Sequence, residues 1–393
     1  MATPEFRRTE FISQSSTFAQ FLRAGTPCMT AEHLFGSKHL GMVAIINEPA
    51  FRELCPELPV SLQLHDVGTP PGRHLADKYM YLMLGFGHEG RTTNIIMDSP
   101  LGDELERQGY DRAAICANIQ NKSYPGGYLT AGGIDLDSLD NVKRYSDSMG
   151  IFEPGWEQDF FGNRWYASGS IEYSPEAYVR ALRWHEGKVV LHEDGIPHLL
   201  GYQRCRSATY AYVDGELNRG VQTPLVLALD EAYLADELPP EFFDMTDYEA
   251  VQHLKRCNPV TKTIIERLEG RDFYYPVEGV SMITSCTLPG DPFKPEGLES
   301  LRDNPWATRE LAQALSKQLG KPLEDVCIFL QYGDKGYRES DIPILTKDGE
   351  LVPAPPSPVE YRFTYRIGAY LYGEPTPAEC EATQAFLSHV TLN

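Results

Sequence analysis

Two patterns of apolar residues alternate along this chain of 393 residues. Short apolar runs separated by turn residues fill residues 41–97, and they predict strands of an antiparallel sheet. Apolar residues spaced three and four apart predict helices at 99–107, 138–149, 174–185, 247–256, 261–269 and 306–319. The mixture predicts an α+β fold, in which several helices pack on a mostly antiparallel and curved β-sheet.

The central part of the chain, residues 174–213, concentrates the polar side chains that could do chemistry. A helix is expected to begin at Ser174, whose hydroxyl can cap free backbone N–H groups, and to end before Gly187. Residues 188–193 predict a short strand and residues 198–213 a long one.

Alternate side chains of a strand share one face. On the predicted strand that face would carry Tyr202, Arg204, Arg206, Tyr210 and Tyr212. Two guanidinium groups can hold a carboxylate or phosphate through forked hydrogen bonds, and a phenol can polarise a carbonyl. We therefore predict substrate binding by the two arginines and Tyr212, and a catalytic role for Tyr202 and Tyr210. The alternative is a solvated sheet face on which the arginines lie along tyrosine rings.

Histidines supply the candidate proton carriers. His192 and His198 are predicted catalytic residues, because a neutral imidazole beside an acid can move protons near pH 7. The alternative is that both are hydrogen-bonded residues at strand ends. A ferrous-iron triad of His192, Asp194 and His253 is a weaker alternative, because His253 falls on a predicted helix.

Other histidines stand directly next to an acid, as in His65-Asp66 and His88-Glu89. Neighbouring residues of a strand point to opposite faces. In the predicted strands these pairs would therefore not act together, and we predict no metal site.

Composition narrows the class of protein. The formal net charge is −21 and no basic run interrupts the chain. Nucleic acid and anionic membrane surfaces attract cationic proteins, so we expect neither as a partner. The eight cysteines are dispersed without close pairs, which indicates free thiols in a reducing compartment. We expect a cytoplasmic protein with no signal peptide and no membrane span, able to form a homo-oligomer.

Known catalytic and cofactor motifs are absent from the sequence. It contains no phosphate-binding glycine loop, no dinucleotide fingerprint, no nucleophile elbow and no zinc-protease motif. The passage 311–332 resembles the helix-to-strand passage of the tautomerase superfamily. That family uses an N-terminal proline at the start of a strand, whereas the matching strand near Val280 begins without one. The resemblance therefore implies no activity here.

These observations lead to three expected domains and one favoured function. We expect an N-terminal arm at 1–40, a β-rich domain with the site at 41–235 and an α+β domain at 236–393. The alternative is that the last two form one continuous fold. The favoured function is a cofactor-independent lyase or isomerase that acts on a small organic acid or ketone by acid/base catalysis. A metal- or haem-dependent enzyme and a non-catalytic ligand-binding or assembly protein are the alternatives.

Overall fold

The computed structural model describes residues 30–148, 155–158, 164–167, 173–213, 216–277, 282–286, 301, 304–332, 340–359 and 363–392. Its contacts divide the chain into two compact units. The first unit comprises residues 1–16, 26–211 and 336–360, and the second comprises 17–25, 212–335 and 361–393. The predicted boundaries at residues 40 and 235 stay predictions.

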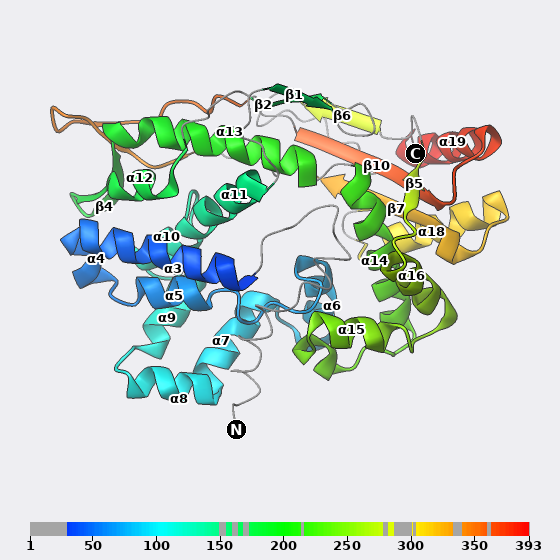
Figure 1. Ribbon diagram of the computed structural model, residues 1–393, viewed down its shortest axis with the longest axis horizontal. Helices are drawn as coiled ribbons and strands as arrows, with labels where there is room; N and C mark the ends of the chain where they lie inside the picture. Colours follow the sequence, from blue (N-terminus) through cyan, green and yellow to red (C-terminus); the bar gives the residue numbers. More distant parts are fainter. Residues whose placement is uncertain are drawn as a thin grey trace. The chain divides into compact units, whose positions relative to one another are not determined.

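The predicted α+β class is confirmed, but the balance of helix and strand is not the expected one. Helices make up most of the described residues, and the strands form small sheets that are not strongly curled (Figure 1). The extensive curved sheet was therefore a wrong prediction. The difference arises mainly in residues 41–97, where every predicted strand is helix.

The helices of the first unit follow one another closely. Their bounds are α3 Thr30–Asn47, α4 Pro49–Leu54, α5 Leu58–Leu64, α6 His74–Leu84, α7 His88–Asp98, α8 Pro100–Arg107, α9 Arg112–Ile119, α10 Gly126–Ala131, α11 Leu136–Ser148, α12 Pro175–Arg180 and α13 Ile196–Val213. α3 packs against α5 and α11 (Figure 1). In α5 six of the seven residues are buried, so its apolar run has no polar face. Such a run cannot be told from a buried strand by periodicity.

Helix caps act where the sequence indicated them. Ser174 accepts a hydrogen bond from Ala177 N at 3.2 Å, and Ser99 accepts one from Leu101 N at 3.1 Å. The helix that starts after Ser174 nevertheless ends at Arg180, five residues before the predicted end at His185. The residues that follow pair as strands, so cross-strand hydrogen bonds replace the continued helix there.

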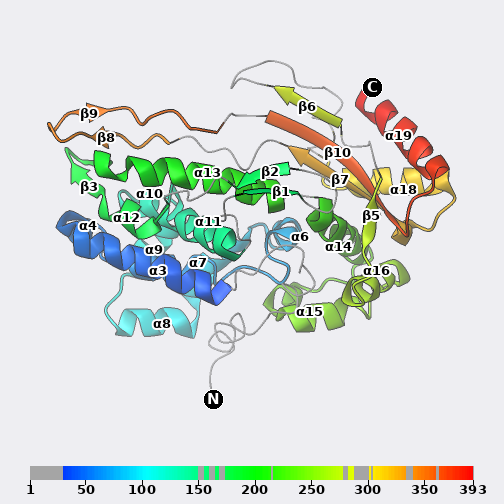
Figure 2. The same cartoon turned by 45° about the horizontal axis from the view of Figure 1, so that its top comes forward.

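Two small sheets belong to the first unit. β1 (Gly155–Gln158) pairs antiparallel with β2 (Arg164–Ala167). The other sheet has the order β3-β4-β8-β9, formed by β3 (Leu182–His185), β4 (Lys188–His192), β8 (Ile344–Leu345) and β9 (Leu351–Val352). β4 and β8 are parallel, with Leu191 opposite Ile344. The other neighbours are antiparallel, among them β8 and β9, which lie side by side in Figure 2.

The predicted long strand at 198–213 is wrong, because these residues belong to α13. Buried residues recur there at helical intervals, at Leu199, Tyr202, Cys205 and Thr209. Ser146 of α11 lies 3.2 Å from Thr209 between the two hydroxyl oxygens, so this stripe faces α11. A helix turns about 200° over two residues, and consecutive members of the proposed arginine–tyrosine face therefore point in different directions.

The second unit has its own sheet and helices. Its elements are α14 Glu216–Leu234, α15 Asp247–Leu254, α16 Pro259–Glu269, β5 Tyr274–Pro276, β6 Met282–Cys286, α18 Ala307–Leu319, β7 Val326–Tyr332, β10 Phe363–Tyr372 and α19 Pro377–Leu392. β10 pairs antiparallel with β5, β6 and β7. The predicted helices at 247–256, 261–269 and 306–319 are confirmed within three residues, and Gly320 ends α18 in the left-handed conformation.

Each unit buries apolar side chains of its own. In the first unit Phe51, Leu58, Tyr178 and Tyr202 belong to one core cluster, and in the second Leu315 and Leu371 belong to another. Cys55, Cys116, Cys205, Cys257, Cys327 and Cys380 are free thiols. No helix among the described residues is both long and apolar enough to cross a bilayer.

Candidate metal centre

Three segments of the first unit bring two histidines and two aspartates together. His33 lies in the first turn of α3, His65 directly follows α5, and Asp137 lies in the first turn of α11. Asp66 is the residue after His65. We call these four side chains the His/Asp cluster. An acid in the first turn of a helix is favourably placed, because the free N–H groups give that end a partial positive charge.

The donor atoms of the His/Asp cluster converge closely. Nε2 of His33 lies 2.7 Å from Oδ1 of Asp137 and 3.3 Å from Nε2 of His65. His65 Nε2 is in turn 3.3 Å from the same Asp137 oxygen and 3.8 Å from Oδ2 of Asp66. Ligands bound to one zinc-sized ion at about 2.1 Å are separated by roughly 3.0 to 3.4 Å. The two separations of 3.3 Å match this range, and those of 2.7 Å and 3.8 Å lie within a few tenths of an ångström of it.

The other ring nitrogens are already engaged outside the cluster. Nδ1 of His65 is 2.8 Å from the carbonyl oxygen of Leu62, and Nδ1 of His33 is 2.8 Å from Oδ2 of Asp140. Both partners are acceptors, so each Nδ1 donates to its partner and each ring turns its Nε2 into the cluster, where this atom can take up a proton or bind a cation. This is the usual arrangement of metal-binding histidines.

The Nε2 atoms of His33 and His65 are 3.3 Å apart, and two nitrogen lone pairs at this distance repel each other unless a proton or a metal ion binds to them. Burial lowers the pKa of His65, but Asp66 and Asp137 outweigh burial and raise that pKa to about 10. Burial raises the pKa of Asp137, whereas His65 and His33 hold it well below its usual range. The cluster therefore favours positive charge on its nitrogens. A divalent cation satisfies both nitrogens and both carboxylates at once, which one proton cannot do.

A second group of titratable side chains lies next to the His/Asp cluster. Oδ2 of Asp77, in α6, is 2.7 Å from Nδ1 of His88 and 3.1 Å from Nδ1 of His74. Nε2 of His88 is 4.0 Å from Oδ1 of Asp66. Burial lowers the pKa of His88, but Asp77 and Asp66 outweigh burial and raise it. His88 therefore connects the two groups and favours its protonated form.

The histidines predicted as catalytic lie elsewhere in the first unit. Nδ1 of His192 is 3.1 Å from Oδ2 of Asp194, and Nδ1 of His198 is 3.3 Å from Ser174 N, which donates to it. Both contacts hold local turns at ends of helices. The proposed iron ligand His253 lies in α15, where its Nε2 is 2.7 Å from the carbonyl oxygen of Glu237. Catalysis by His192 and His198 stays a prediction.

The residues predicted to bind substrate are not gathered on one face. Arg204 is exposed, whereas Arg206 is half-buried and its guanidinium lies 4.5 Å above the ring of Tyr210. Nη1 of Arg206 donates to the hydroxyl of Tyr202 at 3.4 Å, and its buried Nε has no hydrogen-bond partner among the described residues. Tyr202 itself is buried, and Tyr212 belongs to α13 but its side chain lies outside the described ones.

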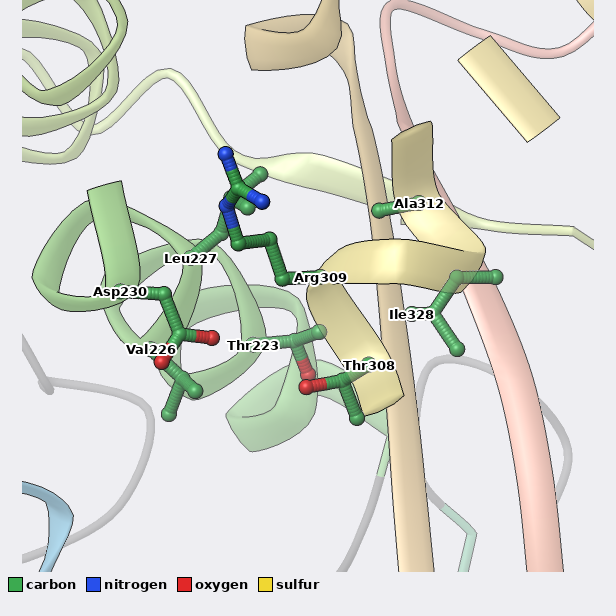
Figure 3. A pocket seen from close by; sticks show the side chains of 8 residues that line it. All are labelled: Thr223, Val226, Leu227, Asp230, Thr308, Arg309, Ala312 and Ile328. Carbon is green, nitrogen blue, oxygen red and sulfur yellow. The ribbon is translucent and has the colours of Figure 1, made fainter. Parts of the chain in front are cut away.

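One further hollow belongs to the second unit (Figure 3). It is formed by side chains of α14, α18 and β7, among them Thr223, Asp230 and Arg309. The free space is about 10 Å³, which is roughly the room that one water molecule needs. Nε of Arg309 is bound to Glu231 at 2.5 Å. The hollow is too small for a substrate, and the His/Asp cluster remains the stronger candidate.

The sequence contained a signal for the cluster that the strand prediction concealed. The dipeptide His65-Asp66 closes a helix instead of lying within a strand, so the two side chains need not point to opposite faces. A helical interpretation of residues 58–64 would have placed the dipeptide at a helix end. His33 and Asp137 offered no local signal, because 104 residues separate them.

Solved structures share the architecture of this chain. A phosphohydrolase from Bacteroides thetaiotaomicron VPI-5482 superposes with a TM-score of 0.63 at 16% identity, covering 95% of this chain and 94% of that chain. A hypothetical protein from Aquifex aeolicus superposes with a TM-score of 0.65 at 17% identity, covering 98% and 93%. No protein-family model and no curated protein matches the chain. At these identities the likeness establishes the fold alone.

Proposed function

We propose that this chain is a metal-dependent phosphohydrolase whose centre is the His/Asp cluster. The observation that carries the proposal is the convergence of His33 Nε2, His65 Nε2 and Asp137 Oδ1 at separations of 2.7 to 3.3 Å. The name of the structural neighbour, a phosphohydrolase, supports the reaction class. The comparisons do not support the lyase or isomerase activity favoured from the sequence. The proposed reaction also depends on a metal ion, whereas the sequence favoured a cofactor-independent one.

The nitrogen and oxygen donors of the cluster suit a divalent transition-metal ion of intermediate hardness. Two imidazoles favour zinc or iron, and two carboxylates also accommodate manganese. Such an ion, when bound by His33, His65, Asp66 and Asp137, supplies a Lewis acid that polarises a phosphoryl oxygen and makes water a better nucleophile.

The protein's own groups supply the rest of the hydrolysis. Water attacks phosphorus and releases a proton to solvent. The bond from phosphorus to the leaving oxygen breaks, and that oxygen takes up a proton from the protein, which solvent then replaces. His88 is placed to give this proton, because its Nε2 faces Asp66 at 4.0 Å while Asp77 holds its Nδ1. His74, whose side chain is 72% exposed, adds a further imidazole on the solvent side of Asp77.

Substitution of His33 by alanine tests the proposal. The full chain is loaded with Mn²⁺, metal binding is measured by calorimetry, and hydrolysis is measured with p-nitrophenyl phosphate, its diester and a set of nucleotides. We expect His33→Ala to lose metal affinity and hydrolysis together. His39→Ala is the matched control, because His39 lies on the same helix, is largely exposed and pairs only with Glu176 among the described residues. Wild-type protein that binds no divalent ion would refute the proposal.

The anion-binding role predicted for Arg206 fits this function without being required by it. Its guanidinium is positive at neutral pH and stacks on Tyr210. A phosphate group is a ligand that such a fork can hold through two hydrogen bonds. Arg206 therefore stays a proposed substrate-binding residue, with Arg204 the weaker of the two because it is exposed.

A further inference from the structure

The outward-facing nitrogen of His33 meets a second buried acid. Oδ2 of Asp140, on α11, lies 2.8 Å from Nδ1 of His33. The same oxygen accepts a hydrogen bond from Nε of Arg144 at 2.6 Å. His33 and Asp140 are both buried. A chain of contacts thus runs from Arg144 through Asp140 and His33 to Asp137.

Gly36 makes room for this chain of contacts. A Cβ atom at position 36 would lie 2.0 Å from Oδ1 of Asp140 and 2.2 Å from Nη2 of Arg144. Glycine is a poor residue for the interior of a helix, and Gly36 lies one turn after His33 in α3. Only a glycine lets the Asp140–Arg144 pair of α11 come this close to the backbone of α3.

We propose that Asp140, held by Arg144, is a positioning residue for the metal centre. The inference rests on the proposed function, since it assigns the support of one ligand of that site. Asp140 accepts the Nδ1–H of His33, which fixes the ring in the tautomer with a free Nε2 lone pair. The negative charge beside Nδ1 also makes that lone pair a stronger donor to a cation. Arg144 fixes the rotamer of the carboxylate through its hydrogen bond.

A purely structural role is the competing explanation. The contact could serve only to join α3 to α11, which pack against each other. A structural contact would contribute to the melting temperature of the metal-free protein and leave the metal affinity of the folded protein unchanged. A positioning contact would lower the affinity of the folded protein for the metal, and the two roles therefore differ in what they change.

Substitution of Asp140 by asparagine, in the full chain, separates the two roles. Mn²⁺ affinity is measured by calorimetry, and the melting temperature is measured without metal. We expect Asp140→Asn to weaken Mn²⁺ binding roughly 10- to 100-fold. Asp147→Asn is the matched control, because Asp147 is on the same helix, is exposed and pairs with Lys143 at 2.5 Å. Its affinity for Mn²⁺ should equal that of the wild type.

Three further variants keep the result decisive. Gly36→Ala should weaken Mn²⁺ binding in the same direction, because its methyl group displaces Asp140. Arg144→Lys, which keeps a positive charge, should retain more affinity than Arg144→Met, and this comparison decides the case if Asp140→Asn does not fold. Unchanged affinity in folded Asp140→Asn, or equal affinities for the two Arg144 variants, would overturn the inference.

Failure of the inference differs from failure of the proposed function. If Asp137→Asn loses Mn²⁺ binding and Asp140→Asn does not, the metal centre stands and only the positioning role is refuted. If the wild-type protein binds no Mn²⁺, Zn²⁺ or Fe²⁺, both are refuted.

Discussion

Asp77 and His88 share a hydrogen bond of 2.7 Å between Oδ2 and Nδ1, although they belong to different helices, α6 and α7. The carboxylate also lies 3.1 Å from His74 and is half-buried. Burial raises the pKa of Asp77, but the two histidines outweigh burial and lower it well below its usual range. A charged acid therefore holds His88 beside Asp66. The first two predictions for the proposed phosphohydrolase depend on this geometry.

Loss of His88 should reduce turnover without loss of metal. His88→Gln removes the proposed proton donor but leaves His33, His65, Asp66 and Asp137 in place. General acid catalysis contributes roughly 10²- to 10⁴-fold to a rate, and kcat should fall by that factor. Steady-state kinetics with p-nitrophenyl phosphate measures kcat, and calorimetry with Mn²⁺ measures the metal affinity. A parallel loss of metal affinity would show instead that His88 is a ligand.

Removal of the Asp77 charge should shift the pH profile. Asp77 and Asp66 raise the pKa of His88 against the effect of burial. His88 must be protonated to donate, so a raised pKa extends activity towards higher pH. In Asp77→Asn the pKa falls, and the alkaline limb of kcat against pH should move to lower pH. An unchanged alkaline limb would assign that limb to another group.

Arg206 offers a direct test of anion binding. Arg206→Ala removes a guanidinium that stacks on Tyr210 at 4.5 Å and approaches the hydroxyl of Tyr202 at 3.4 Å. If it binds the substrate phosphate, KM should rise about tenfold or more, since a hydrogen bond to a charged group contributes roughly 1.5 to 3 kcal/mol. Arg204→Ala, which removes the exposed arginine of the same helix, should raise KM less than Arg206→Ala does. Equal KM values for Arg206→Ala and the wild type, with a lower melting temperature for Arg206→Ala, would leave Arg206 a structural role.

The start of α15 should contribute measurable stability. Thr246 accepts from Glu249 N, and the Glu249 carboxylate accepts in return from Thr246 N at 2.8 Å. Thr246→Ala should lower the free energy of unfolding by about 1 kcal/mol. Thr263→Ala, inside α16, is the control and should change it little, because alanine is the better helix former. Equal effects in urea denaturation would contradict a capping role.

The start of α19 should be sensitive to acid. A hydrogen bond from Lys321 lowers the pKa of Glu379 from 4.5 to about 2, helped by the backbone N–H of Thr376. Because the folded pKa lies below the unfolded one, Glu379 stabilises the fold above pH 4.5, and this contribution disappears as the pH falls towards 2. Glu379→Gln should therefore be less stable than the wild type at pH 7 and nearly equal to it near pH 2.5. A constant difference across this range would contradict the assignment.

The sequence was sufficient for elements that short-range interactions specify. Caps such as Ser174 and Ser99 and the stop at Gly320 act within one helical turn, so the starts of α12 and α8 and the end of α18 were predictable. The α+β class followed from the same local signals. Residues 41–97 and 198–213 were misjudged, because buried helices carry apolar residues on most sides and lose the amphipathic period.

The His/Asp cluster, which is the proposed metal centre, depended on contacts between distant parts of the chain. His33 and Asp137 come together because α3 packs against α11, and Asp77 meets His88 because α6 and α7 both begin near that centre. Local propensity carries no information about such pairs. The hydrogen bonds and apolar groups buried between helices decide them, and only the packed tertiary structure shows which nitrogen faces which oxygen.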